Sequence, residues 1–327
     1  MSRFADATVE RTPIRAKQSW RASLSIIWEI ARYTTAAETL QTIRLTVARD
    51  SSASRRQASA STVATRREFA YPYRLPVRTF MIPFEDVTIG KDESENKVLR
   101  EVGTKPEFDF APKDYLTLGE KLGLIDVKRA SEVSGSRFGY ILRDAALLEF
   151  ALIQLAFDTL TKKGFIPAVP PVMIKPKVYE GMGRLAADQK DERYYFEKDD
   201  VYLVGSSEHT MGPIHMNDVF EEEALPKRYV AFSTCFRREA GSYGKDTKGI
   251  LRVHQFDKVE MFSFAHPEHS EEEHKFLLSC QEELMQKLEI PYRVVEICTG
   301  DMGWTDARQF DVETWFPGQG SYRETNS

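Results

Sequence analysis

Residues 236–262 read FRREAGSYGKDTKGILRVHQFDKVEMF, and this stretch decides the fold. Its two ends lie in runs rich in aromatic and β-branched residues, which predict strands over Tyr229–Phe236 and Val253–Phe264. The residues between them are polar and contain several glycines, which is typical of a loop. The stretch therefore predicts an antiparallel hairpin with a long polar connection.

Three side chains of this hairpin suggest a binding site. Arg237 stands at the end of the first strand and offers a planar fork of donors suited to a phosphate or a carboxylate. Phe256 on the return strand can stack on a purine ring, and Glu260 follows four residues later on the same strand face. Such a hairpin can hold phosphate, base and amine together. The residues alone fit a solvated charged turn with Phe256 in the core equally well.

Other nucleotide-binding motifs are absent from the sequence. No GxGxxG follows a predicted strand, so the sequence gives a dinucleotide fold no support. Residues 241–245 superficially resemble a phosphate loop, but the spacing differs and no Ser or Thr follows Lys245. The sequence therefore does not favour a P-loop enzyme either.

The remaining pattern predicts an α+β domain with a mostly antiparallel sheet. Apolar residues at helical spacing predict a helix from Asp144, as its cap, to Lys163, and Gly164 ends it. Several prolines predict that Phe165–Met173 is extended. Three glutamates after Ser270 mark the start of a helix that ends near Leu288. Further strands are predicted at Tyr292–Ile297, Gln309–Trp315 and Tyr322–Asn326.

Composition narrows the class of protein. Of the 327 residues, 42% are hydrophobic and 29% charged, which is ordinary for a globular protein. No apolar run approaches the ~20 residues that cross a bilayer. The three widely spaced cysteines, Cys235, Cys280 and Cys298, are predicted to be reduced thiols of a cytoplasmic protein. The histidines of AHPEHSEEEH (residues 265–274) fit a solvated helix entrance better than a metal site.

Residues 1–80 differ from the rest of the chain. They carry 14 Lys and Arg against 6 Asp and Glu, whereas the whole chain has a net charge of −5. The tract Ser51–Arg67 is rich in Ser, Ala and Arg and has little to bury, which predicts disorder. An organelle transit peptide is the functional alternative for this basic segment.

The order of the motifs resembles that of the seryl-tRNA synthetases, which are class II aminoacyl-tRNA synthetases. The hairpin sequence is similar to their motif 2 nearly throughout, and GFIPAVPPVM (164–173) looks like motif 1. The resemblance runs in family order over residues 82–327. It implies a connection to the tRNA-binding arm at 81–110 and a bacterial-type catalytic domain at 111–327 that stops before motif 3.

This resemblance implies a fold and an activity. The fold is the class II catalytic fold, a six- or seven-stranded antiparallel sheet flanked by helices, in a homodimer formed through Phe165–Met173. The activity is that of a serine--tRNA ligase, which uses ATP and Mg²⁺ to activate L-serine and then loads tRNA(Ser). A catalytically inactive, synthetase-like binding or regulatory module is the alternative.

The resemblance also assigns site residues. Arg237 and Glu239 are the expected catalytic residues. ATP is expected to contact Arg237, Arg238, Glu239, Phe256, Glu324, Thr325, Asn326 and Ser327, with Glu324 and Ser327 also binding Mg²⁺. Serine is expected to contact Ser206, Ser207, Glu208, Arg237 and Glu260.

The chain departs from the family pattern in three places. Most bacterial members carry Thr-Ala-Glu where this chain has Ser206-Ser207-Glu208, although the hydroxyl and the carboxylate are kept. Residues 1–80 do not resemble the family's coiled coil, and the chain ends before motif 3. From the missing motif 3 we expect weaker ATP binding and an exposed apolar surface.

Overall fold

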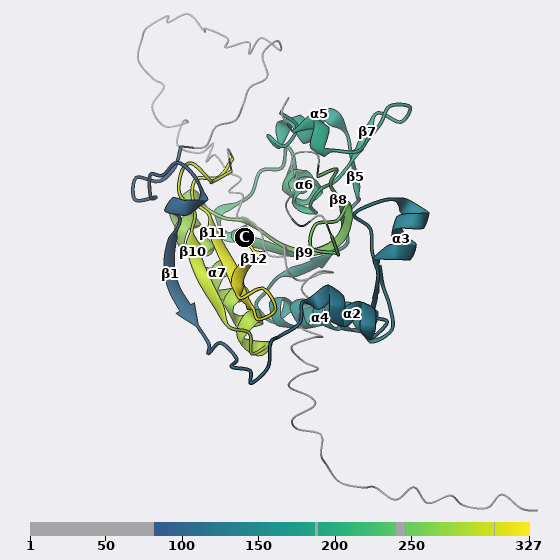
Figure 1. Cartoon of the computed structure of the whole chain (residues 1–327). Coiled ribbons are helices and arrows are strands. Elements are labelled where there is room, and N and C mark those ends of the chain that lie inside the picture. The colour runs from purple at the N-terminus through teal and green to yellow at the C-terminus, as the bar shows by residue number, and fades with distance from the viewer. Residues whose placement is uncertain (1–81, 187–188, 240–245, 247, 304) are drawn as a thin grey trace, which may run out of the picture.

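The computed structural model describes residues 82–186, 189–239, 246, 248–303 and 305–327 (Figure 1). The predicted disorder and the alternative transit peptide within residues 1–80 lie outside these residues.

The predicted hairpin is confirmed. Strands β8 (Lys227–Phe236) and β9 (Gln255–Phe264) pair antiparallel over ten residues each, without a register shift. Strand β9 begins at Gln255 and not at Val253, because the N–H of the intervening His254 donates to the carbonyl of Arg137 in another segment. Strand β4 (Ile166–Ala168) pairs parallel with β8, so the sheet order is β4-β8-β9. Its Pro167 is tolerated because β4 is an edge strand.

A second sheet contains four strands in the order β1-β10-β11-β12, all antiparallel. Three of them confirm the predicted strands: β10 (Tyr292–Glu296), β11 (Phe310–Phe316) and β12 (Ser321–Asn326). Strand β1 (Lys97–Val102) lies in the expected connection and was not predicted, because nearly all its residues are exposed and show no burial alternation. The seven strands thus form two hydrogen-bonded sheets, where the resemblance implied one.

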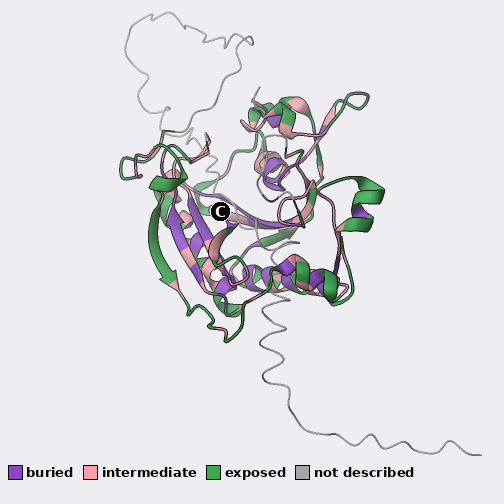
Figure 2. Ribbon diagram, viewed as in Figure 1, coloured by how far each residue is buried: buried purple, intermediate pink, exposed green. Residues whose placement is uncertain are grey.

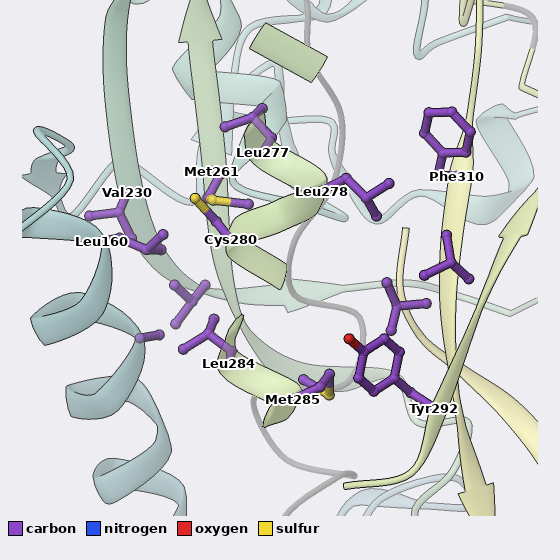
Figure 3. Packing of buried hydrophobic residues seen from close by; sticks show 14 of the residues in the cluster. Leu160, Val230, Met261, Leu277, Leu278, Cys280, Leu284, Met285, Tyr292 and Phe310 are labelled. Carbon is purple, nitrogen blue, oxygen red and sulfur yellow. The ribbon is translucent and has the colours of Figure 1, made fainter. Parts of the chain in front are cut away.

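Two long helices cover one face of both sheets and form the main core with them (Figures 1 and 3). They are α4 (Asp144–Thr161) and α7 (Ser270–Lys287), close to the predicted bounds. Asp144 is not the cap as predicted; it is the first helical residue, where its charge still favours the helix dipole. The core is tightly packed, with Leu160 of α4 fully buried and Leu284 of α7 nearly so.

Smaller elements lie on the opposite face of the β8–β9 hairpin. Helix α6 (Glu208–Met211) contacts β9, and Met211 packs against Phe262. A three-stranded sheet of order β5-β7-β6 lies beside it with helix α5 (Pro176–Gly181). Its strands are β5 (Met173–Ile174), β6 (Tyr195–Phe196) and β7 (Val201–Leu203). The hairpin is therefore sandwiched between the main core and this smaller layer.

A third layer packs around the hairpin loop. It contains α2 (Tyr115–Lys121), β2 (Ile125–Asp126), α3 (Val127–Ser134) and β3 (Tyr140–Ile141). The Tyr115 hydroxyl accepts a hydrogen bond from the Ile250 N–H at 3.1 Å, which attaches this layer to the hairpin. Short 3₁₀ helices complete the described chain at Glu93–Glu95, Lys190–Glu192, Gly212–His215, Glu222–Ala224 and Pro267–His269.

Burial follows this layering (Figure 2). The centres of β8–β11 are buried, whereas β1 and the outer surface of α4 are exposed. Within the described part of the chain, no helix combines the length and the apolar character that a bilayer crossing requires.

Candidate active site

The register of the hairpin places the predicted binding residues on one face. Cys235 pairs with Phe256 and Ala231 with Glu260, so Arg237, Phe256 and Glu260 project from the side that faces α6. The Arg237 guanidinium lies 5.0 Å from the centre of the Phe256 ring. The predicted sharing of a strand face by Phe256 and Glu260 is thereby confirmed.

The loop before α6 is held against the end of β8. The Phe236 N–H donates to the Val204 carbonyl at 2.8 Å, and Arg237 Nε donates to the Gly205 carbonyl at 3.1 Å. A Cβ at position 205 would lie 2.9 Å from Arg193 Nη1 and 3.4 Å from Arg237 Cγ. A side chain at this position would therefore have to displace the Arg193 guanidinium, so the close approach of the two arginines favours glycine.

His209 fixes the same loop from beneath. Its Nδ1 accepts a hydrogen bond from the Gly205 N–H at 3.2 Å and lies within hydrogen-bond distance of the Tyr179 hydroxyl, at 2.9 Å. The bond from Gly205 needs an unprotonated Nδ1, and burial holds the pKa of His209 well below its ordinary value. The neutral imidazole thus serves as a fixed acceptor, which sequence reasoning missed.

A buried polar cluster forms the floor of the site. Lys258 Nζ lies 3.0 Å from Glu260 Oε2 and 3.1 Å from Ser206 Oγ, and both charged side chains are fully buried. Ser206 Oγ donates to the same Glu260 oxygen at 3.0 Å. Burial raises the pKa of Glu260 to about 7, although Lys258 opposes that rise. Glu260 Oε1 is buried and has no hydrogen-bond partner among the described residues.

Glu208 forms the second acidic wall. Arg184 donates to its Oε1 from Nε at 2.9 Å and from Nη2 at 2.8 Å. Beside it, Ser207 Oγ is buried without a hydrogen-bond partner in the described structure. Arg184 was not predicted, because it lies outside every recognisable motif and reaches the site only through the fold.

The loop side of the hairpin carries the remaining charged residues. Arg238 is exposed, and Glu239 pairs with Arg252 at 2.9 Å. Asp246 forms an ion pair with Arg323, which connects the hairpin to β12. Residues 240–245 and 247 lie outside the described structure.

A β-bulge decides which residues of β12 share a face. Glu324 pairs with Glu313 and Asn326 with Val312. The chain therefore advances two residues on β12 where it advances one on β11, and the extra residue forms the bulge. Glu324 and Ser327 are three apart and would face opposite ways in a regular strand. The bulge brings them to the same face.

The other residues assigned to β12 are engaged within the sheet. Thr325 Oγ1 donates to the Val312 carbonyl at 2.7 Å, and Asn326 is fully buried. Ser327 Oγ accepts a hydrogen bond from Gln309 Nε2 at 2.9 Å. Thr325 and Asn326 therefore have clear structural roles at this edge.

The donor set on β12 fits Mg²⁺ carried by a phosphate ligand. Glu324 offers an exposed carboxylate and Ser327 a hydroxyl, both hard oxygen donors. Across the described ranges, no group of three or more His, Cys, Asp or Glu side chains could hold a metal ion. A cation that keeps several waters and takes one or two protein oxygens suits such a site best.

The histidines near residue 270 have local roles. His266 Nδ1 accepts a hydrogen bond from the Glu268 N–H at 3.3 Å, which caps a short 3₁₀ helix. His274 packs 5.0 Å from the Phe310 ring, and burial lowers its pKa to about 4.

Comparisons with known proteins agree with this geometry. Residues 194–327 match the model of the tRNA synthetase class II core domain (G, H, P, S and T). The chain is 52% identical over 235 residues to the serine--tRNA ligase of Acidothermus cellulolyticus, covering 72% of this chain. The chain spans 56% of the length of that relative and about half the length of the curated relatives that it matches.

Two solved structures share the fold. The seryl-tRNA synthetase of Pyrococcus horikoshii complexed with ATP superposes with a TM-score of 0.73 at 43% identity, covering 76% of this chain and 60% of that one. The cytoplasmic serine-tRNA ligase of Naegleria fowleri in complex with AMP superposes with a TM-score of 0.70 at 34% identity. The superposition covers 74% of this chain and 58% of that one. Together with the confirmed hairpin, these similarities show that the chain belongs to the seryl-tRNA synthetase family.

Proposed function

We propose that this chain carries the adenylate-forming site of a serine--tRNA ligase, with L-serine and ATP as substrates and tRNA(Ser) as acceptor. The observation that carries the proposal is the position of Arg237. Its guanidinium lies 5.0 Å from the centre of the Phe256 ring, on the strand face that also carries the buried Glu260. One fork of donors can therefore reach a phosphate and an amino-acid carboxylate at the same time.

The buried polar cluster offers a partner for each group of serine. It contains Ser206, Ser207, Glu208 and Glu260, and Glu208 would supply a carboxylate for the ammonium group. The free oxygen of Glu260 can accept a hydrogen bond from the serine hydroxyl. Arg237 then holds the serine carboxylate, so that all three polar groups of the amino acid have a partner.

The hairpin and β12 would orient ATP. Phe256 provides a stacking surface for adenine, and Arg238 and Glu239 flank the nucleotide. The serine carboxylate attacks the α-phosphorus, the bond to the departing pyrophosphate breaks, and seryl-adenylate forms. Arg237 contributes by neutralising charge on the phosphate oxygens and by holding both reactants in line. Glu324 and Ser327 would hold Mg²⁺, which neutralises phosphate charge when bound.

Assembly and location complete the proposal. Several large apolar residues on α4 and the segment after it are exposed, which suits a homodimer interface. They are Leu147, Phe150, Ile166, Val169 and Met173. The proposed location is the cytoplasm, where tRNA is available and the buried thiols stay reduced.

Binding of stable adenylate analogues tests the proposal. The seryl, threonyl and alanyl forms of sulfamoyladenosine would be titrated into the purified chain by calorimetry at pH 8. We expect the seryl form to bind more than about tenfold tighter than either other form, because only serine satisfies the buried acceptor without added bulk. Equal affinity for the three analogues, or no binding of the seryl form, would refute the proposal.

A further inference from the structure

We infer that Lys258 is a positioning residue for amino-acid selection: with Ser206 it occupies one oxygen of Glu260 and leaves only the other for a ligand hydroxyl. This inference rests on the proposed function and deepens it. Lys258 itself need not touch the substrate. Its effect is exerted through the charge and the orientation of Glu260.

The hydrogen bonds of Ser206 are the first support. Its hydroxyl donates to Glu260 Oε2 at 3.0 Å and accepts from Lys258 Nζ at 3.1 Å and from the Glu208 N–H at 3.2 Å. A serine hydroxyl has one proton and two lone pairs, so these three bonds use its full capacity. Ser206 therefore holds Glu260 in place and has no bond left for a ligand.

The placement of Lys258 is the second support. It lies two residues before Glu260 on the same face of β9, and both side chains are fully buried. Its ammonium reaches the one oxygen that Ser206 also contacts. Since a buried charge is tolerated only with a partner, Lys258 lets a carboxylate remain ionised at this depth.

The unsatisfied oxygen is the third support. Glu260 Oε1 is buried and has no hydrogen bond from any described residue. A ligand that brings a hydroxyl satisfies this acceptor, whereas an alanyl ligand of the same shape leaves it stranded. Sites built in this way reject the analogue without the hydroxyl by up to ~10⁴–10⁵-fold.

The charges around Glu260 come from several elements. Lys258 lies on the same strand, Glu208 comes from α6 with Arg184 paired to it, and Cys235 lies on β8. Burial raises the pKa of Cys235 to about 11, so this thiol stays neutral. Burial and the Glu208 charge both raise the pKa of Glu260, and Lys258 is the main opposing influence.

Removal of the ammonium gives a distinctive pH signature. The pKa of Glu260 is already raised to about 7 with Lys258 present, so without Lys258 it should rise further. A protonated Glu260 carries no charge, and its hydrogen can point at the ligand in place of a lone pair. Selection for a hydroxyl should then weaken at neutral pH and recover only in more alkaline solution.

The test compares Lys258→Met with the unaltered chain. Affinities for seryl- and alanyl-sulfamoyladenosine would be measured from pH 6 to pH 9. In the unaltered chain we expect the seryl-to-alanyl affinity ratio to increase through about pH 7. In Lys258→Met the ratio at pH 7 should fall by more than about tenfold, and the increase should move to higher pH. Lys275→Met removes an exposed lysine of α7 and should leave the profile unchanged.

Two outcomes would overturn the inference while the proposed function stands. The first is a Lys258→Met chain with the same affinity ratio and the same pH profile as the unaltered chain. The second comes from the Glu260→Gln background and can be measured even if Lys258→Met alone does not fold. Because Lys258 acts only through Glu260, adding Lys258→Met to Glu260→Gln should change the seryl-to-alanyl affinity ratio by less than about twofold. A large further loss of the ratio in that background would overturn the inference, because it would mean that Lys258 contacts the ligand directly. An unaltered chain that binds neither analogue would overturn the proposed function, and this inference with it.

Discussion

At the scale of single residues, Arg237 is where the hairpin, the loop before α6 and the aromatic ring of Phe256 meet. Its Nε donates to the Gly205 carbonyl, its N–H to the His254 carbonyl, and its guanidinium lies over Phe256. These contacts hold a flat, permanently charged fork in one orientation before any ligand arrives. A lysine has neither the fork nor the Nε donor, so it cannot reproduce this arrangement.

Arg237→Lys should therefore weaken binding without harming the fold. We expect affinity for seryl-sulfamoyladenosine to fall by about 10- to 150-fold, the loss from one or more charge-assisted hydrogen bonds. Calorimetric titration would measure it, and the urea midpoint should stay within error of the unaltered chain. Arg129→Lys is the matched control, because Arg129 is 76% exposed on α3. A variant that binds as well as the unaltered chain would remove Arg237 from the site.

At the scale of elements, α4 and β9 meet through a pair of carboxyl groups. Glu149 of α4 hydrogen-bonds to Asp257 of β9, and Asp257 Oδ1 accepts from Thr234 Oγ1 at 2.7 Å. Both acids line a cavity of about 300 Å³ between the helix and the hairpin. Burial and the neighbouring Asp257 raise the pKa of Glu149 to about 8. Glu149 therefore keeps its proton at neutral pH.

This pair should make stability fall as pH rises. Because the folded pKa of Glu149 is near 8 and its ordinary value is 4.5, the fold binds this proton more tightly than the unfolded chain does. Its contribution is complete below about pH 4.5 and is lost progressively up to about pH 8. Glu149→Gln keeps a donor for Asp257 and cannot ionise. Its urea midpoint should match that of the unaltered chain at pH 5 and exceed it at pH 8.5.

Glu132→Gln on the exposed surface of α3 serves as the control for that measurement. It should leave the midpoint unchanged at both pH values. If Glu149→Gln and the unaltered chain lost stability in parallel between pH 5 and pH 8.5, Glu149 would not hold a proton at neutral pH.

At the scale of the whole molecule, several large apolar residues of α4 and of the segment that follows it are exposed. Leu147 and Phe150 are each 66% exposed, and Val169 is 81% exposed. Exposed apolar side chains in this number favour association with another chain. The class II resemblance places the dimer interface in the same part of the sequence.

Phe150→Glu should consequently favour the monomer. A charge within the proposed interface would have to be buried without a partner, so the proposed dimer should dissociate at concentrations where the unaltered chain stays associated. Light scattering coupled to size exclusion measures the mass directly. Ile89→Glu, at a residue 87% exposed and outside this surface, should leave the mass unchanged. A Phe150→Glu chain that remains a dimer would place the interface elsewhere.

The sequence predicted local structure well, because the signals involved are local. The two hairpin strands, the long helices and the three late strands lie within a few residues of their predicted bounds. Strand β1 was missed because an exposed edge strand shows no alternation of apolar residues. The capping role of Asp144 was wrong because Arg143 adopts the N-cap position with a positive φ, which its sequence does not signal.

What the sequence determined by itself is the family, the order of elements and the strand face shared by Phe256 and Glu260, since strand periodicity and a long motif suffice for these. Only the tertiary structure decided three other features. It placed Arg184 against Glu208, fixed the loop before α6 with His209, and used a bulge to bring Glu324 and Ser327 to one face. Each depends on contacts between segments far apart in the chain or on a local register shift. Burial and register are properties of the packed molecule, so no reading of neighbouring residues could supply them.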